Sequence, residues 1–164
     1  MKKRIFICLI LIVAILCTSC TREKRIEYCE LGIVLTKDFE PYDSEGAYSV
    51  AYSDGVAIVG ISRFSFVDCE ELGLLTTFTP LKLAEVYLEM MDRTVDESVK
   101  KHGDVPYFSY TVISDDGEAF FYMPTFYRTP YAYFVITFIT PKSREMVGRV
   151  EFLEYTRTVY LIDV

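Results

Sequence analysis

Short runs rich in β-forming residues, several of them alternating between apolar and polar positions, fill much of the chain after residue 30. Such runs cover residues 32–35, 47–53 and 56–66. The last two flank Asp54-Gly55, and because Gly adopts the positive φ that a type I′ turn requires, this pair predicts a β-hairpin. The early part of the chain is therefore expected to form antiparallel strands.

Three further strands with many aromatic residues are expected at 107–113, 118–128 and 131–140. Asp115-Asp116-Gly117 turns the first into the second, and Thr129-Pro130 turns the second into the third. Connections this short make the neighbouring strands antiparallel. Pro124 has no N–H to donate, so we expect a bulge or an edge position in the middle strand.

Two segments show a helical period instead. The first begins at Thr79-Pro80, where Thr is a good N-cap and Pro suits the first helical position. Lys100, Lys101 and His102 would occupy its last turn, where positive charge complements the helix dipole, and Gly103 would end it. The apolar stripe of this helix is Leu81, Ala84, Tyr87, Leu88, Met91, Val95 and Val99.

The second helix starts at Thr140-Pro141, and a closing strand follows at 156–162. Its expected apolar stripe is Met146, Val147, Val150 and Leu153. The complete order is strand, hairpin, helix, three antiparallel strands, helix and strand. This order predicts an α+β domain in which helices cover an antiparallel β-sheet.

The first 20 residues have the composition of an export signal. Lys2, Lys3 and Arg4 precede the apolar run 5–16, and Thr18-Ser19 leads to Cys20. A membrane span needs about 20 apolar residues, so this run of twelve is too short to be one.

Residues 16–20 resemble the cleavage site of bacterial lipoprotein signal peptides, although Cys17 stands where Leu is usual. The resemblance implies cleavage before Cys20, acylation of Cys20 with a lipid such as palmitate, and attachment to the extracytoplasmic face of the cell membrane. Ordinary cleavage with secretion and an uncleaved anchor are the alternatives. The expected organisation is a signal peptide at 1–19, a lipidated tether at 20–30 and one domain at 31–164.

The amino-acid composition limits the kinds of partner that are expected. The 164 residues include 17 basic and 24 acidic ones, and three of the basic residues belong to the signal. A mature domain this acidic repels phosphate backbones, so nucleic acid is not an expected partner. The expected partners are the membrane, through the N-terminal lipid, and an envelope protein or small ligand that the sequence does not identify.

Few residues suggest chemistry. Cys29 and Cys69 could form a disulfide or be buried separately, and their spacing fits neither a metal site nor a redox motif. His102 is the one histidine, and the usual nucleophile, nucleotide and zinc motifs are absent from the sequence. Loose calcium binding around Asp38, Glu40, Asp43 and Glu45 is a minor alternative. We therefore predict no metal, no cofactor and no enzymatic activity.

The excess of aromatic residues favours two readings. Most of these side chains can be explained by core packing on both faces of the sheet. If part of one face is open, a binding surface could form there. Its residues would be Tyr122, Phe126, Tyr127, Arg128 and Tyr131.

The element order also resembles the Mog1/PsbP superfamily, which includes small bacterial lipoproteins. The similar features are the run 32–35 leading to Asp38-Phe39, the Asp54-Gly55 hairpin, the aromatic meander, and the 140–141 helix start leading to residues 159–161. Members of this family look like accessory and binding proteins, including photosystem II assembly factors and a regulator of a nuclear-transport GTPase. The family has no shared catalytic set, so no functional residue is transferred.

Together these features predict a membrane-anchored extracytoplasmic lipoprotein whose domain is a non-catalytic binding or accessory module of the cell envelope. An alternative is a secreted or anchored hydrolase that uses a carboxylate pair, and Glu70-Glu71 and Asp115-Asp116 are the adjacent acidic pairs. A structural role in dimers, through an edge strand near Pro124 or at 156–162, is the third.

Overall fold

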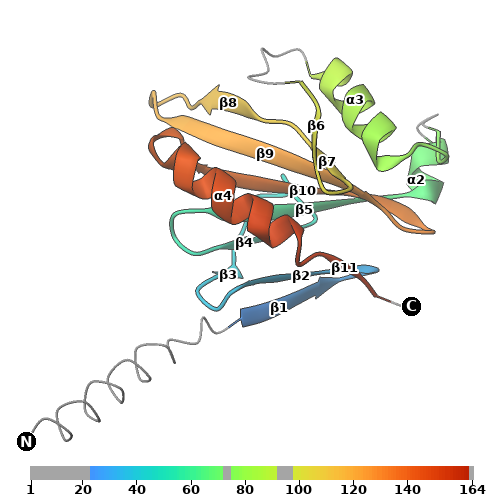
Figure 1. Cartoon of the computed structure of the whole chain (residues 1–164), viewed down its shortest axis with the longest axis horizontal. Coiled ribbons are helices and arrows are strands. Elements are labelled where there is room, and N and C mark those ends of the chain that lie inside the picture. The colour runs from blue at the N-terminus through green and yellow to red at the C-terminus, as the bar shows by residue number, and fades with distance from the viewer. Residues whose placement is uncertain (1–22, 72–74, 92–97, 163–164) are drawn as a thin grey trace, which may run out of the picture.

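The computed structural model describes residues 23–71, 75–91 and 98–162, which form two antiparallel sheets and a few helices (Figure 1). The large sheet has the order β3-β4-β5-β10-β9-β7-β6, and β8 pairs with β9. Its strands are β3 (Glu40–Pro41), β4 (Val50–Ser53), β5 (Ile58–Ser65), β6 (Lys100–His102), β7 (Val105–Tyr107), β8 (Tyr110–Ile113), β9 (Ala119–Arg128) and β10 (Ala132–Pro141). The predicted α+β class with an antiparallel sheet is confirmed.

A small sheet packs below the large one and contains β1 (Glu23–Tyr28), β2 (Leu31–Thr36) and β11 (Tyr160–Leu161), in the order β1-β2-β11 (Figure 1). The expected tether at 20–30 thus includes a strand, and the described fold begins at Glu23 rather than at residue 31. Sequence patterns miss β1 because Ile26 is its one buried residue and the others are mostly charged. The closing strand expected at 156–162 is reduced to β11.

Strand β10 organises both faces of the large sheet. Nine of its ten residues are buried, and it pairs antiparallel with β5 on one side and β9 on the other. Phe134, Ile136 and Phe138 belong to the main core, whereas Val135 belongs to a second core on the opposite face. A strand buried in this way needs a cover on each face.

The helices and the small sheet provide those covers. Helix α4 (Glu145–Thr156), preceded by the 3-10 turn η1 (Lys142–Arg144), and the small sheet close the face of the main core. Helix α3 (Pro80–Met90) lies over the opposite face, and the short α2 (Phe66–Glu71) follows β5 at one end of the sheet (Figure 1). In the part of the chain that the structure describes, no helix is long and apolar enough to cross a membrane.

The predicted hairpin at Asp54-Gly55 is confirmed, because β4 and β5 pair antiparallel and Gly55 has a φ of +89°. The loop is longer than a type I′ turn, since Ser53 pairs with Ile58. The Asp54 carboxylate accepts hydrogen bonds from the backbone N–H of Val56 and of Ala57, at 2.8 and 2.7 Å, and so holds the loop.

Pro124 acts on the neighbouring strand rather than on its own. It lies buried within β9, neither at an edge nor in a bulge, and pairs with Thr137 of β10. On its other side β7 and β8 keep one register with β9, which sets Phe108 opposite Pro124. Because Pro cannot donate to that neighbour, the strand expected at 107–113 is interrupted at residues 108–109.

The start of α3 is as predicted, but its end is not. Thr79 Oγ1 accepts a hydrogen bond from Lys82 N at 3.2 Å, and Pro80 is the first helical residue. The helix ends at Met90, and Lys100–His102 form β6 instead of a last helical turn, so the dipole role expected for His102 is wrong. Gly103, with a φ of +60°, turns β6 into β7. Of the expected stripe, Val95 lies outside the described residues.

The expected face of α4 is wrong for three of its four residues. Met146, Val147 and Val150 are exposed, whereas Leu153 packs against the main core, and Gly148, Phe152 and Thr156 are buried. Gly148 decides the orientation, because a Cβ there would lie 2.8 Å from Thr140 Cγ2. The absence of a side chain lets the helix pack closely against β10, and the first three residues of the expected stripe are left outside.

An ion pair links the two sheets. Arg63 of β5 donates two hydrogen bonds to the Glu30 carboxylate in the β1–β2 turn, at 2.9 and 2.6 Å. Both side chains are largely shielded, with 24% and 12% of their surfaces exposed. The Arg63 guanidinium therefore lowers the pKa of the Glu30 carboxyl below its ordinary value.

We expect Arg63→Gln to reduce the free energy of unfolding at neutral pH by about 1–2 kcal/mol, because it removes a shielded, bidentate pair. Glu30 contributes this stability above its ordinary pKa, and the contribution is lost as the pH falls through the lowered, folded-state value. Urea unfolding at neutral pH and in acid measures the difference, which should shrink in acid. Arg157→Gln, which breaks the exposed Arg157–Glu154 pair, is the control and should change little.

Candidate functional site

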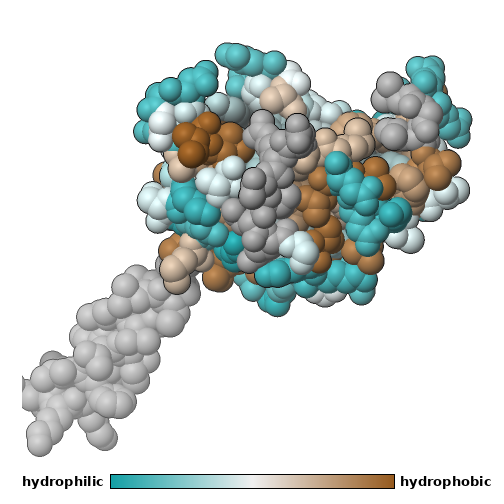
Figure 2. All heavy atoms as spheres, turned by 90° about the horizontal axis from the view of Figure 1, so that it is seen from above, coloured by the Kyte–Doolittle hydropathy of each residue, from teal (hydrophilic) through white to brown (hydrophobic). Residues whose placement is uncertain are grey.

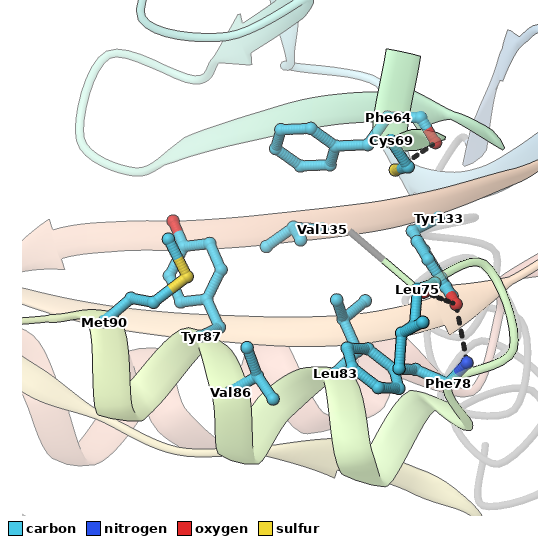
Figure 3. A pocket seen from close by; sticks show the side chains of 10 residues that line it. All are labelled: Phe64, Cys69, Leu75, Phe78, Leu83, Val86, Tyr87, Met90, Tyr133 and Val135. Carbon is cyan, nitrogen blue, oxygen red and sulfur yellow. Dashed lines mark hydrogen bonds between the residues drawn. The ribbon is translucent and has the colours of Figure 1, made fainter. Parts of the chain in front are cut away.

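An apolar cavity of about 140 Å³ lies between α3 and the uncovered part of the large sheet (Figure 3). Its lining surface is entirely apolar. Seen from the α3 side, apolar side chains are exposed between hydrophilic ones (Figure 2). This cavity is the candidate site, because a small apolar ligand pocket of this kind is the usual form of a binding site.

Helix α3 forms one long wall of the cavity. Leu83, Val86, Tyr87 and Met90 line it, at helical spacings of three and four. The seven steps from Leu83 to Met90 rise about 10 Å along the helix, so the cavity is a slot that runs along two turns. Met90 has 72% of its surface exposed and marks the open end.

The sheet and α2 form the opposite wall. Phe64 of β5 and Tyr133 of β10 are directly paired across the two strands, and Val135 follows on the same face. Cys69 closes this wall from α2, where it is buried. Figure 3 shows the slot between these side chains and those of α3.

Tyr133 fixes the far end of the slot. Its hydroxyl donates to Leu75 O at 3.0 Å and accepts from Phe78 N at 2.8 Å (Figure 3). These two bonds hold the segment that enters α3 against the sheet, and Leu75 and Phe78 line the cavity there. The hydroxyl is thereby committed to the backbone rather than to a ligand.

The other polar groups of the lining are uncharged at neutral pH. The Cys69 thiol points to Phe64 O, with a sulfur–oxygen distance of 4.0 Å. Burial, assisted by the Asp68 carboxylate, raises the pKa of this thiol, and burial also raises the pKa of the Tyr87 hydroxyl. Both groups are therefore protonated at neutral pH, and Cys69 is a poor nucleophile.

One positive charge stands near the far end. Arg128 donates to Thr76 O at 3.3 Å, next to the lining residue Leu75. Its guanidinium carbon also lies 5.1 Å from the centre of the Phe66 ring, which packs edge-on against Tyr133. Arg128 is exposed and does not itself line the slot.

The residues expected to form a binding surface do not come together at the α3 slot. Phe126 is buried in the second core, while Tyr127 points to the opposite face of β9. Tyr131 is 58% exposed, and Tyr122 lines a different, more polar cavity beside Tyr48. The reason is strand alternation, which sends neighbouring side chains to opposite faces. None of the five lines the α3 slot, and Arg128 is next to it only through its hydrogen bond to Thr76 O, beside the lining residue Leu75.

Two further cavities are larger than the slot but have mixed polar and apolar linings. One of about 380 Å³ is walled by the acidic 42–48 loop, where burial raises the pKa of Tyr48 to about 12. The other, of about 250 Å³, lies between β7, β9 and β11, and Phe126, Tyr127 and Arg128 contribute to it.

The remaining predicted residues can also be located. Cys29 and Cys69 are both free in the structure, the former exposed and the latter buried. The acidic pairs Glu70-Glu71 and Asp115-Asp116 are exposed on α2 and in the β8–β9 turn. Among the described residues, no three His, Cys, Asp or Glu side chains converge as a metal site. Cys20 lies outside the described residues.

Sequence patterns missed most of this cavity. Leu83 and Val86 lie off the stripe assigned to α3, and Cys69 lies in α2, a helix that the sequence patterns did not predict. The available signal was the apolar cluster at residues 81–91, which is too wide for one buried stripe. A helix that is apolar beyond its core face has a second surface to cover.

Comparison with solved structures places the fold, and no family profile or curated protein sequence matches the chain. A protein from Bacteroides thetaiotaomicron VPI-5482 is similar with a TM-score of 0.54 and 17% identity over 81% of this chain. The chain spans only 45% of that protein. Cyanobacterial PsbP (CyanoP) from Synechocystis sp. PCC 6803 is similar with a TM-score of 0.54 and 8% identity, over 88% of this chain and 95% of its own. The fold is thus Mog1/PsbP-like, as the sequence suggested.

We expect Tyr133→Phe to lower the free energy of unfolding by about 1–3 kcal/mol, because Leu75 O and Phe78 N lose their shared partner. Urea denaturation measures the change. Tyr131→Phe removes the hydroxyl of an exposed residue two positions away and should have almost no effect. Equal stability of the two variants would show that the hydroxyl does not hold the end of the slot.

Proposed function

We propose that the chain is a lipid-anchored extracytoplasmic protein whose domain is a non-catalytic binding module, with the α3 slot as its binding site. The observation that carries the proposal is the wholly apolar lining of this cavity. A dry cavity of about 150 Å³ lined by apolar side chains is large enough to bind a molecule such as benzene. The site therefore suits an uncharged apolar group.

The position of the slot supports a role at a membrane. Strand β1 and helix α3 lie on opposite sides of the molecule (Figure 1). Glu23 begins β1 three residues after Cys20, and three extended residues reach at most about 10 Å. A lipid on Cys20 would hold the small sheet close to the bilayer and leave the slot facing outward.

Three carboxyl groups are held as partners of other side chains and lack the raised pKa of a general acid. A general acid needs a raised pKa. Hydrogen bonds to Arg63, Ser114 and Lys142 instead lower the pKa of Glu30, Asp116 and Glu145, respectively. These three carboxyls act as structural partners.

We expect indole to bind the slot and raise the thermal midpoint of the full chain in a concentration-dependent way. Binding to the folded state alone stabilises by about 2.7 kcal/mol at a hundred times the Kd. Val86→Phe should abolish this shift. Val86 is half-buried in the lining, so the larger Phe side chain would fill the slot.

Val150→Phe is the matched control for this measurement. It makes the same change on the exposed face of α4, outside the slot, and should leave the indole shift intact. A chain whose midpoint does not respond to indole, or responds equally in Val86→Phe, has no apolar site at α3.

We also expect Cys20→Ser to move the protein from the membrane fraction to the soluble fraction of the envelope, since the lipid attachment atom is lost. Immunoblotting of fractionated cells, with intact mass of the purified protein, measures this. Cys29→Ser changes an exposed thiol outside the signal and should leave the protein in the membrane. Retention of Cys20→Ser with an unchanged mass would contradict lipidation.

A further inference from the structure

We propose that the α3 slot binds the alkyl chain of a single-chain anionic amphiphile, such as a fatty acid, with its head group at Arg128. This inference rests on the proposed function, since it takes the slot to be the binding site. It adds the shape of the ligand and the charge of its head group.

The shape of the slot favours a chain over a compact ring. Leu83, Val86, Tyr87 and Met90 follow one another along two helical turns, and Phe64 and Val135 lie opposite them (Figure 3). The space is thus extended along α3. An unbranched alkyl chain fills such a space with contacts on both walls.

The lining also favours a chain that carries no polar group along its length. The Tyr133 hydroxyl is saturated by Leu75 O and Phe78 N, and the Cys69 thiol points to Phe64 O. A ligand hydroxyl or amide placed in the slot would lose its water without gaining a partner. The polar end of a ligand must therefore remain at an opening.

The two ends of the slot differ in the charge of the residues around them. Met90 makes the opening at one end apolar. At the other end, beyond Leu75, stands the exposed Arg128, which the Thr76 carbonyl and the Phe66 ring hold in place. A guanidinium has five donors in a planar fork, so one bond to Thr76 leaves it able to bind a carboxylate.

The test compares decanoate, decanol and decyltrimethylammonium, all below their micellar concentrations, for binding to the full chain in lipid nanodiscs. Equilibrium dialysis of the radiolabelled probes, with empty discs subtracted, gives the affinities. Decanoate should bind most tightly, with one molecule per chain. From hexanoate to decanoate, each added methylene should tighten binding about fourfold until the slot is full.

Two variants locate the chain and the head group. Val86→Phe should weaken decanoate at least tenfold, and Val150→Phe should not. Arg128→Gln should weaken decanoate about tenfold and leave decanol unchanged, whereas Arg157→Gln, at an exposed arginine of α4's C-cap, should change neither.

Equal affinities for decanoate and decyltrimethylammonium, or an Arg128→Gln variant that binds decanoate normally, would overturn the anionic head group. Decanoate binding that survives Val86→Phe would place the chain elsewhere. If indole binds the slot and no decyl probe does, this inference fails while the proposed function stands. If indole also fails to bind, the apolar site itself is refuted.

Discussion

Burial of β10 on both faces is the constraint from which the rest of the structure follows. Its side chains alternate between two apolar cores, so water must be excluded from both sides of the large sheet. Helix α4 and the small sheet do this fully on one face, where Phe134, Ile136 and Phe138 are almost inaccessible. On the other face the cover is α3, only 11 residues long, and the slot lies where this cover ends.

The two faces differ in how closely their covers approach. Gly148 lets α4 pack directly against Thr140, because no Cβ intervenes. Helix α3 packs on the β7 and β9 side of the sheet, where Ala84 is buried and Tyr87 packs on Phe108 and Phe126. The β5 side of the sheet is covered less closely. A cavity between α3, Phe64 and Val135 is the geometric consequence.

The arrangement of the domain is compatible with both a binding role and a membrane anchor. The short connection from Cys20 to β1 would keep the small sheet near a bilayer, and the slot opens on the opposite side. Tethering raises the effective concentration of a site for components of the same envelope. An apolar slot that faces away from the bilayer, with Arg128 nearby, would then meet amphiphilic ligands that have left the membrane.

Local patterns in the sequence determined the α+β class, the Asp54-Gly55 hairpin and the N-terminus of α3, because each depends on contacts between residues close in the chain. The structural effect of Pro124 could not be predicted from the neighbouring sequence, because its missing N–H interrupts a partner strand that lies about 16 residues earlier in the chain. The outward face of α4 was decided by Gly148 against β10, and β1 by its pairing with β2. Only the tertiary structure decided the slot, because its walls come from β5, α2, α3 and β10, and the volume left between packed elements is not encoded in any one of them.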